Sequence, residues 1–151
     1  MKMTLDHDIP NLKQVTPAPM LVYRGGQPRD AMAWSHLRSL GITTVVKLNT
    51  EPGDETSGLI VCPFPITTVQ QIFGPVEGQL NSALSAITNG TYVHCELGEN
   101  RTGTLIILYR IRVCGWTKEM AIAEANETEW GWSLPALKIF VAELGFGDDA
   151  P

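Results

Sequence analysis

The 151-residue sequence has little positive charge and no long apolar run. Its 11 lysines and arginines are outnumbered by 16 aspartates and glutamates, which leaves a net charge of −5. A protein that binds the phosphate backbone of nucleic acid usually carries a basic face, so we expect no nucleic-acid partner. No apolar stretch reaches the ~18 residues that a spanning helix needs, so we expect no membrane span.

Cysteine is also scarce, and its spacing matches no zinc motif. The three thiols of Cys62, Cys95 and Cys114 cannot all pair with one another. This pattern favours free thiols in a reducing compartment. Residues 1–10 contain no apolar stretch typical of a secretory signal, so we expect a cytoplasmic protein.

The composition predicts one folded domain over residues 1–151. Hydrophobic residues make up 44% of the chain and charged residues 18%, which excludes a mainly disordered protein. The proline-containing segment 1–19 is expected to be extended, and residues 146–151 are expected to form a frayed tail. The length suits a single domain with its own core.

Strand-like and helical segments alternate along the chain. The predicted strands cover residues 20–23, 42–48, 59–66 and 91–95, and the two prolines of the third place it at a sheet edge. The predicted helices cover residues 30–40, 76–87, 102–113, 117–126 and 135–144. The pattern favours an α/β fold with a central, mostly parallel sheet of four to five strands flanked by helices.

One stretch, residues 93–103, carries recognisable chemistry. A β-branched strand ends in Cys95, five residues lead to Arg101, and an apolar helix follows at once. Loop N–H groups, the helix N-terminus and a bidentate arginine can together hold a tetrahedral dianion. The same surroundings favour the thiolate of Cys95, and Thr102 can donate its hydroxyl to the sulfur. A thiolate beside a bound phosphate is a nucleophile for phosphoryl transfer.

This stretch resembles the signature of the cysteine-dependent protein tyrosine phosphatase superfamily. The matching pattern is His94-Cys95-x-x-Gly98-x-x-Arg101-Thr102-Gly103. The small size of the chain and the segments at 23–28 and 40–49 are similar to the small bacterial dual-specificity-like branch. The resemblance runs over residues 20–145.

The resemblance implies a two-step reaction without metal or cofactor. Cys95 attacks phosphorus to form a phosphocysteine, and water then hydrolyses that intermediate. His94 and Gly103 are implied to support the loop, and Thr102 to assist the sulfur. The residues implied to bind the phosphate are Glu96, Leu97, Gly98, Glu99, Asn100 and Arg101.

The general acid departs from the family pattern, which usually has an aspartate on a mobile loop upstream of the cysteine. Residues 56–94 contain no aspartate, and Glu77 is their only carboxylate. Three interpretations remain open. Another carboxylate acts as the general acid, the enzyme works slowly without an acid, or the protein is a phosphate-binding module with little turnover. The candidate carboxylates are Asp54, Glu55, Glu99, Glu127 and Glu129. We favour Glu99 because it must lie at the rim of the site.

The loop also bears on the substrate. Glu96 and Glu99 would repel a second phosphate nearby, even in screened solvent. This disfavours polyphosphorylated lipids and inositols and favours a phosphorylated protein, above all phosphotyrosine with dual specificity, or a small phosphomonoester. A rhodanese-like sulfur transferase also holds a cysteine in an anion-binding loop, but it would not need the sequence Arg101-Thr102-Gly103.

Five residues outside this stretch could either act at the site or have a purely structural role. Arg24 and Gln27 are expected to brace the loop. Lys47 and Arg29 are expected on the solvated surface, with attraction of an anionic substrate as the alternative. Cys62 is expected in the core rather than as a thiol that pairs with the nucleophile.

Overall fold

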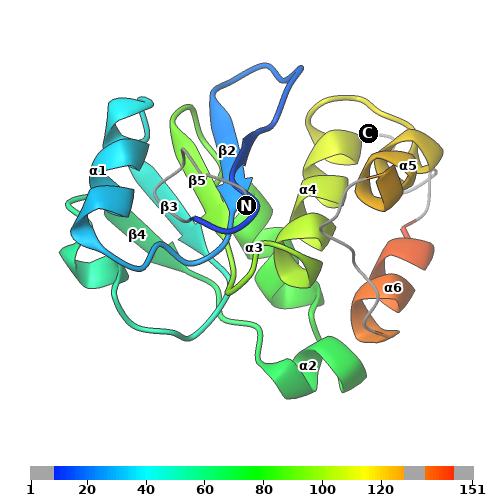
Figure 1. The fold of residues 1–151 in the computed structure, drawn as a ribbon. Coiled ribbons are helices and arrows are strands. Elements are labelled where there is room, and N and C mark those ends of the chain that lie inside the picture. The colour runs from blue at the N-terminus through cyan, green and yellow to red at the C-terminus, as the bar shows by residue number, and fades with distance from the viewer. Residues whose placement is uncertain (1–8, 128–134, 145–151) are drawn as a thin grey trace, which may run out of the picture.

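The structure, a computed structural model, describes residues 9–127 and 135–144. Within these ranges the chain forms an α/β fold in which helices cover both faces of one five-stranded sheet (Figure 1). This confirms the predicted fold class. None of the helices in the described ranges is long and apolar enough to cross a membrane.

The sheet has the strand order β1-β2-β5-β3-β4. Its first pair is antiparallel, and all its other neighbours are parallel. The strands are β1 (Lys13–Gln14), β2 (Val22–Gly25), β3 (Thr44–Lys47), β4 (Ile60–Pro63) and β5 (Thr91–His94). Strand β4, which carries one of the two prolines of the predicted strand at residues 59–66, lies at an edge of the sheet, as predicted. Proline has no N–H to donate to the hydrogen bonds between strands.

The helices largely follow the predicted periodicity. They are α1 (Ala31–Ser39), α2 (Thr68–Phe73), α3 (Glu77–Ser85), α4 (Asn100–Arg112), α5 (Lys118–Glu127) and α6 (Pro135–Ala142). The Oδ1 atom of Asp30 caps α1 by accepting from the Ala33 N–H at 2.8 Å. Helix α4 begins two residues before its predicted start, and Thr102 to Arg110 are all buried in it. The expected central, buried helix is therefore confirmed.

Helix α2 was not predicted: it lies between the predicted strand at residues 59–66 and the predicted helix at residues 76–87. A capping box starts this helix: Thr67 Oγ1 accepts from the Gln70 N–H, and Gln70 Oε1 accepts from the Thr67 N–H. Val69 and Phe73 point outward and are 63% and 80% exposed. The helix therefore lacks the apolar, buried face on which periodicity arguments depend.

The two faces of the sheet bury separate apolar clusters. On one face, Trp34 of α1 packs with Val45 and Tyr92 of the central strands. On the other, Val46 and Val93 pack with apolar residues of α3, α4 and α6. Successive side chains of a strand point to opposite faces of the sheet. Because both faces are covered, the central strands must be apolar on both sides.

The connections place a crevice at the carboxyl end of β5. Strand β5 lies between β2 and β3, although it comes last in the chain. The chain leaves β2 toward α1 on one face of the sheet and leaves β5 toward α4 on the other (Figure 1). In open α/β sheets, ligands bind where adjacent connections diverge in this way.

Arg110 joins α4 to α5 and to the N-terminal segment. This residue is only 1% exposed. Its guanidinium donates to both carboxylate oxygens of Glu124, at 3.0 and 2.8 Å, and to the carbonyls of Thr16 and Pro17. It also lies 4.0 Å from the ring centre of Trp116.

We predict that Arg110→Met lowers the free energy of unfolding by about 3 kcal/mol, because it leaves a carboxylate and two carbonyls without their donor. Urea denaturation followed by circular dichroism measures this. Arg112→Met is the matched control, since this exposed arginine of the same helix should cost less than about 1 kcal/mol. Equal losses in the two variants would contradict the role of Arg110.

Candidate active site

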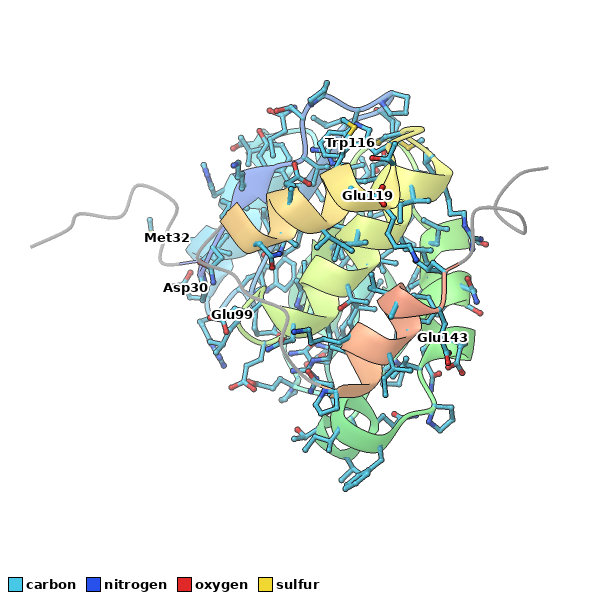
Figure 2. All side chains as sticks on the ribbon, turned by 90° about the vertical axis from the view of Figure 1, so that its right-hand side faces the viewer. Asp30, Met32, Glu99, Trp116, Glu119 and Glu143 are labelled. Atoms are coloured by element: carbon cyan, nitrogen blue, oxygen red, sulfur yellow. The ribbon has the colours of Figure 1, made fainter. Side chains whose placement is uncertain are left out.

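The loop between β5 and α4 begins at Cys95 and ends where α4 starts at Asn100. Cys95 is 2% exposed, and its Sγ atom accepts a hydrogen bond from Thr102 Oγ1 at 3.1 Å. Glu99 precedes α4 and makes no side-chain bond to the first N–H groups of the helix (Figure 2). The positive end of a 13-residue helix therefore faces the loop.

The backbone carbonyls of residues 95–98 are all held by hydrogen bonds from the surrounding chain. The donors, in order, are His94 Nδ1, the Gln27 N–H, Asn11 Nδ2 and Arg24 Nη2, at 3.0, 2.8, 2.7 and 2.9 Å. In a trans peptide the N–H points opposite to the C=O. Fixing these carbonyls therefore turns the N–H groups of residues 96–99 to the opposite side, where an anion can accept from them.

This arrangement confirms that Arg24 and Gln27 brace the loop. Arg24 is 4% exposed, and burial lowers the pKa of its guanidinium to about 10, so the group stays charged at neutral pH. The Gln27 backbone supplies one of the four bonds, and its side chain bonds elsewhere.

Glycines make the close approach between the loop and the β2 turn sterically feasible. Gly98 has φ +76°, and a Cβ there would lie 2.5 Å from the carbonyl carbon of Gly25. A Cβ on Gly26 would lie 2.7 Å from the Glu96 carbonyl oxygen. Larger residues at either position would push the two segments apart and break the hydrogen bonds between them.

Arg101 lies at the edge of a small cavity of about 70 Å³ above Cys95. Its Nη1 donates to the Ile66 carbonyl at 2.9 Å, and its buried Nε has no hydrogen-bond partner among the described residues. The guanidinium is thus anchored at one nitrogen while another can donate to an oxyanion. The cavity is lined by Gln71, Cys95, Glu96, Leu97, Glu99, Asn100 and Arg101.

The structure therefore brings most of the predicted site residues to one cavity, and it adds Gln71. This α2 residue is 5% exposed, and the sequence analysis did not single it out. The capping pattern at Thr67 and Gln70 is the available signal for its helix, but no local pattern tells which side of α2 faces the cavity. Thr102 contacts the sulfur, and Gly103 is buried one residue further along α4.

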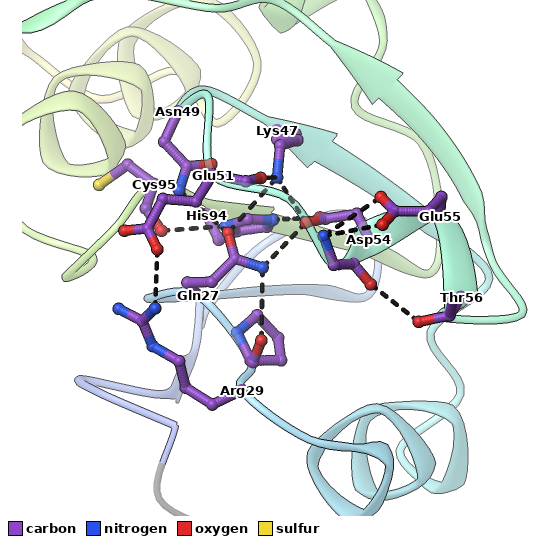
Figure 3. Close-up of polar contacts among 12 residues, drawn as sticks. Gln27, Arg29, Lys47, Asn49, Glu51, Asp54, Glu55, Thr56, His94 and Cys95 are labelled. Carbon is purple, nitrogen blue, oxygen red and sulfur yellow. Dashed lines mark hydrogen bonds and ion pairs between the residues drawn. The ribbon is translucent and has the colours of Figure 1, made fainter.

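A buried polar cluster lies beneath the loop (Figure 3). Asp54 Oδ2 pairs with His94 Nε2 at 2.6 Å, and its Oδ1 accepts from Lys47 Nζ at 2.5 Å and Gln27 Nε2 at 2.8 Å. Burial alone would raise the pKa of the Asp54 carboxyl. The bonds and charge of His94, with the bonds of Lys47 and Gln27, instead hold that pKa well below its usual range.

Two expectations are corrected by this cluster. Asp54 does not line the cavity, and its ionised carboxylate has no proton to give, so it is excluded as a general acid. Lys47 is 9% exposed rather than solvated, because the carboxylate of Asp54 and the Glu51 carbonyl bind its ammonium. Arg29 is exposed, as expected, and pairs with Glu51 at 2.7 Å.

Glu99 and Glu96 are the carboxylates that line the cavity among the described residues. Glu55 is exposed, and its carboxylate accepts from the Gly53 N–H instead. Glu127 ends α5, but its side chain, like the whole of Glu129, lies outside the described residues. Cys62 lies half-buried on β4, separated from β5 by β3.

Comparisons with known proteins agree with this geometry. No protein-family model matches the sequence. The dual specificity protein phosphatase TpbA of Pseudomonas aeruginosa (strain UCBPP-PA14) is 28% identical over a 127-residue alignment that covers 80% of this chain. The chain spans 56% of that protein's length.

Solved structures share the fold. A cysteine-to-serine variant of P. aeruginosa TpbA in complex with phosphotyrosine superposes with a TM-score of 0.69 at 24% identity, covering 97% of this chain and 91% of that one. The catalytic core of the PP-IP phosphatase SIW14 from S. cerevisiae, in complex with citrate, gives 0.66 at 19% identity, covering 85% and 83%. The curated relative, the shared fold and the signature at residues 94–103 all support the superfamily of cysteine-dependent protein tyrosine and dual-specificity phosphatases for this chain.

Proposed function

We propose that this protein hydrolyses phosphate monoesters through a phosphocysteine at Cys95. The observation that carries the proposal is the position of the Cys95 sulfur. It lies at the base of the cavity, with the Thr102 hydroxyl 3.1 Å away and the N-terminal end of α4 directed at the same space. Arg101 lines that cavity from the side. A nucleophile, oxyanion donors and a bidentate cation thus surround one tetrahedral site.

In the first step, the Cys95 thiolate attacks phosphorus and the ester oxygen leaves with the electron pair of the broken P–O bond. The N–H groups of residues 96–99 and the Arg101 guanidinium hold the three non-bridging oxygens. A proton must reach the leaving oxygen when it is a poor leaving group such as a phenolate.

In the second step, water attacks the phosphocysteine and the sulfur leaves as a thiolate. The Thr102 hydroxyl, which already donates to the sulfur, stabilises the charge that develops there. The group that protonated the leaving oxygen now takes the proton from the attacking water. The products are inorganic phosphate and the original thiolate, so the chain needs no metal to complete the cycle.

Glu99 is our candidate for the proton-transfer group. It lines the cavity together with Cys95 and precedes the first turn of α4. Helix α2, which lies upstream of the cysteine in the chain, contributes Gln71 to the cavity instead of a carboxylate. The Gln71 amide can hydrogen-bond the leaving oxygen or the water, but it cannot transfer a proton at neutral pH.

Phosphotyrosine in a protein is the substrate class that the site favours, with phosphoserine and small phosphomonoesters as further substrates. TpbA has been solved with phosphotyrosine bound, whereas SIW14 is described as a PP-IP phosphatase. The acidic side chains of Glu96 and Glu99 around the cavity oppose the additional phosphates of an inositol polyphosphate. The nucleophile must be a reduced thiol, and we place the protein in the cytoplasm, a compartment that keeps thiols reduced.

We predict that Cys95→Ser lowers kcat on a phosphotyrosyl peptide by about 10³-fold or more while the peptide still binds. Arg101→Met should weaken vanadate binding about 100-fold, and Arg101→Lys should recover only part of it, because a lysine cannot bind two oxygens in the planar fork. Phosphate release and calorimetric titration measure these effects. Turnover near wild type in Cys95→Ser would refute the covalent mechanism.

The role of Glu99 is tested with two leaving groups. Glu99→Gln should slow phosphotyrosine hydrolysis about 100-fold but slow an activated aryl phosphate, whose leaving group needs no proton, less than about fivefold. Glu96→Gln, which removes the neighbouring carboxylate of the same cavity, is the matched control and should slow neither substrate strongly. Equal slowing of both substrates by Glu99→Gln would show that Glu99 shapes the loop rather than donates a proton.

Charge at the cavity should decide between substrate classes. We predict that the wild-type protein hydrolyses a phosphotyrosyl peptide much faster than an inositol polyphosphate, and that Glu96→Lys raises kcat/KM for the inositol substrate about tenfold. Rates measured at low and high salt provide the control, because the gain should shrink as salt screens the charge. An unchanged ratio between the two substrates would contradict the electrostatic selection.

A further inference from the structure

Residues 9–17, which we call the N-terminal segment, lie against the turn that follows β2. The Gly26 N–H donates to the Pro10 carbonyl at 2.8 Å, and a Cβ on Gly26 would lie 3.1 Å from the Pro10 Cβ. Ile9 is 4% exposed and belongs to the apolar cluster that contains Trp34 of α1. The segment is therefore part of the packed domain, and it lies beside the turn that contacts the catalytic loop.

Asn11 extends from this segment to the loop itself. Its Nδ2 donates to the Leu97 carbonyl at 2.7 Å, although the two residues are 86 positions apart in the sequence. Asn11 has φ +55°, and among the described residues other than glycine it alone has a positive φ. Asparagine adopts this left-handed conformation more readily than most residues with a side chain. Both the backbone conformation and the amide group thus suit asparagine to this position.

The chain on either side of Asn11 fixes its position. The hydrogen bond to the Pro10 carbonyl precedes it, and β1, which pairs with β2, follows it closely. Val15, just after β1, is 4% exposed, and its N–H donates to the Val22 carbonyl at 2.8 Å. The buried guanidinium of Arg110 donates to the carbonyls of residues 16 and 17. The Asn11 amide is therefore held in place before any ligand binds.

The peptide that Asn11 holds is one that could otherwise turn over. The peptide between Leu97 and Gly98 leads into a glycine with φ +76°, and glycine adopts positive and negative φ about equally well. The Leu97 carbonyl and the Gly98 N–H point in opposite directions. A flip of this peptide would turn the carbonyl toward a bound anion and the N–H away from it, and the glycine provides no steric barrier against the flip.

The other three tethers of the loop are buried, whereas the tether from Asn11 is at the surface. His94, Gln27 and Arg24 are only 0%, 1% and 4% exposed. Leu97 is 48% exposed, and its hydrogen bond to Asn11 is exposed as well. Without the Asn11 amide, water could bind the Leu97 carbonyl in either orientation of the peptide, so neither orientation would leave it unsatisfied. The orientation of this one peptide therefore depends on one exposed hydrogen bond.

We propose that Asn11 is a positioning residue of the catalytic loop. Its side chain keeps the peptide between Leu97 and Gly98 in the orientation in which the Gly98 N–H faces the anion, and it excludes the flipped orientation. The N-terminal segment thereby becomes part of the anion site, although none of its residues lines the cavity. The consequence for turnover rests on the proposed phosphatase function, whereas the consequence for anion binding does not.

Calorimetric titration of the full chain with tungstate, a tetrahedral dianion, tests the proposal without turnover. Asn11→Gly permits the same left-handed backbone and removes only the amide, so it should weaken tungstate binding about tenfold. Asn11→Asp should weaken it about 100-fold, because a carboxylate cannot donate to the Leu97 carbonyl and can accept from the flipped Gly98 N–H. Gln14→Ala removes an exposed amide side chain of the same segment and is the matched control, with a change of less than about twofold expected.

NMR of the backbone amides separates this positioning role from a general loosening of the loop. In the wild-type protein, tungstate should shift the amide proton resonances of both Leu97 and Gly98, because both N–H groups face the anion. In Asn11→Gly, the shift of Gly98 should be lost or strongly reduced. The shift of Leu97 should persist, because the Gln27 N–H still holds the preceding carbonyl of Glu96.

Tungstate affinity that is unchanged in both Asn11→Gly and Asn11→Asp would overturn the proposal. Equal loss of the Leu97 and Gly98 shifts in Asn11→Gly would also overturn it, because the effect would then extend over the whole loop. If the variants behave as expected but the wild-type protein hydrolyses no phosphate ester, the proposed function fails and the role of Asn11 stands. The two proposals therefore fail by different observations.

Discussion

The tethering of four loop carbonyls is the constraint on which the site depends. A five-residue loop would ordinarily sample many conformations, because it lacks the regular backbone hydrogen bonds of a helix or sheet. Here each carbonyl of residues 95–98 accepts a bond from a side chain or backbone group that the fold already holds in place. The N–H groups consequently face the anion before it binds, which removes the cost of organising them during the reaction.

The same constraint explains why the β2 turn is as important as the loop itself. The β2 turn contacts the loop through Arg24, Gly26 and Gln27. The turn lies beside the loop because β2 and β5 are neighbours in the sheet. Strand order thus converts two segments that lie about 70 positions apart in sequence into one anion site, as a topological switch point does in other α/β folds. The phosphatase chemistry that we propose uses what this junction provides.

The sequence analysis succeeded where the information is local. The spacing of Cys95, Arg101 and Thr102 predicts the loop and the helix that follows, because a strand, a short turn and a helix N-terminus are all defined by neighbours in the chain. It failed for Lys47, whose charge indicates solvent exposure until the fold pairs it with Asp54. It also failed for Asp54 as a candidate acid, because that carboxylate pairs with Lys47 and His94 away from the cavity. Helix α2 was missed because its outward side chains are apolar and exposed, which removes the periodic signal.

The charges around the site divide into two layers. Glu96 and Glu99 line the cavity, while the buried side chains of Lys47, Asp54 and His94 lie beneath the loop. The acidic layer opposes esters that carry additional phosphates, and the buried layer holds the Cys95 carbonyl through His94 Nδ1.

The central claim is that Cys95 carries the phosphoryl group during turnover. The most direct measurement mixes the protein with a phosphotyrosyl peptide that contains radioactive phosphate, quenches with acid within milliseconds and maps the labelled peptide. The account predicts label on the peptide that contains Cys95, formed and lost at rates consistent with turnover. Turnover without label on Cys95 at any time point would contradict it.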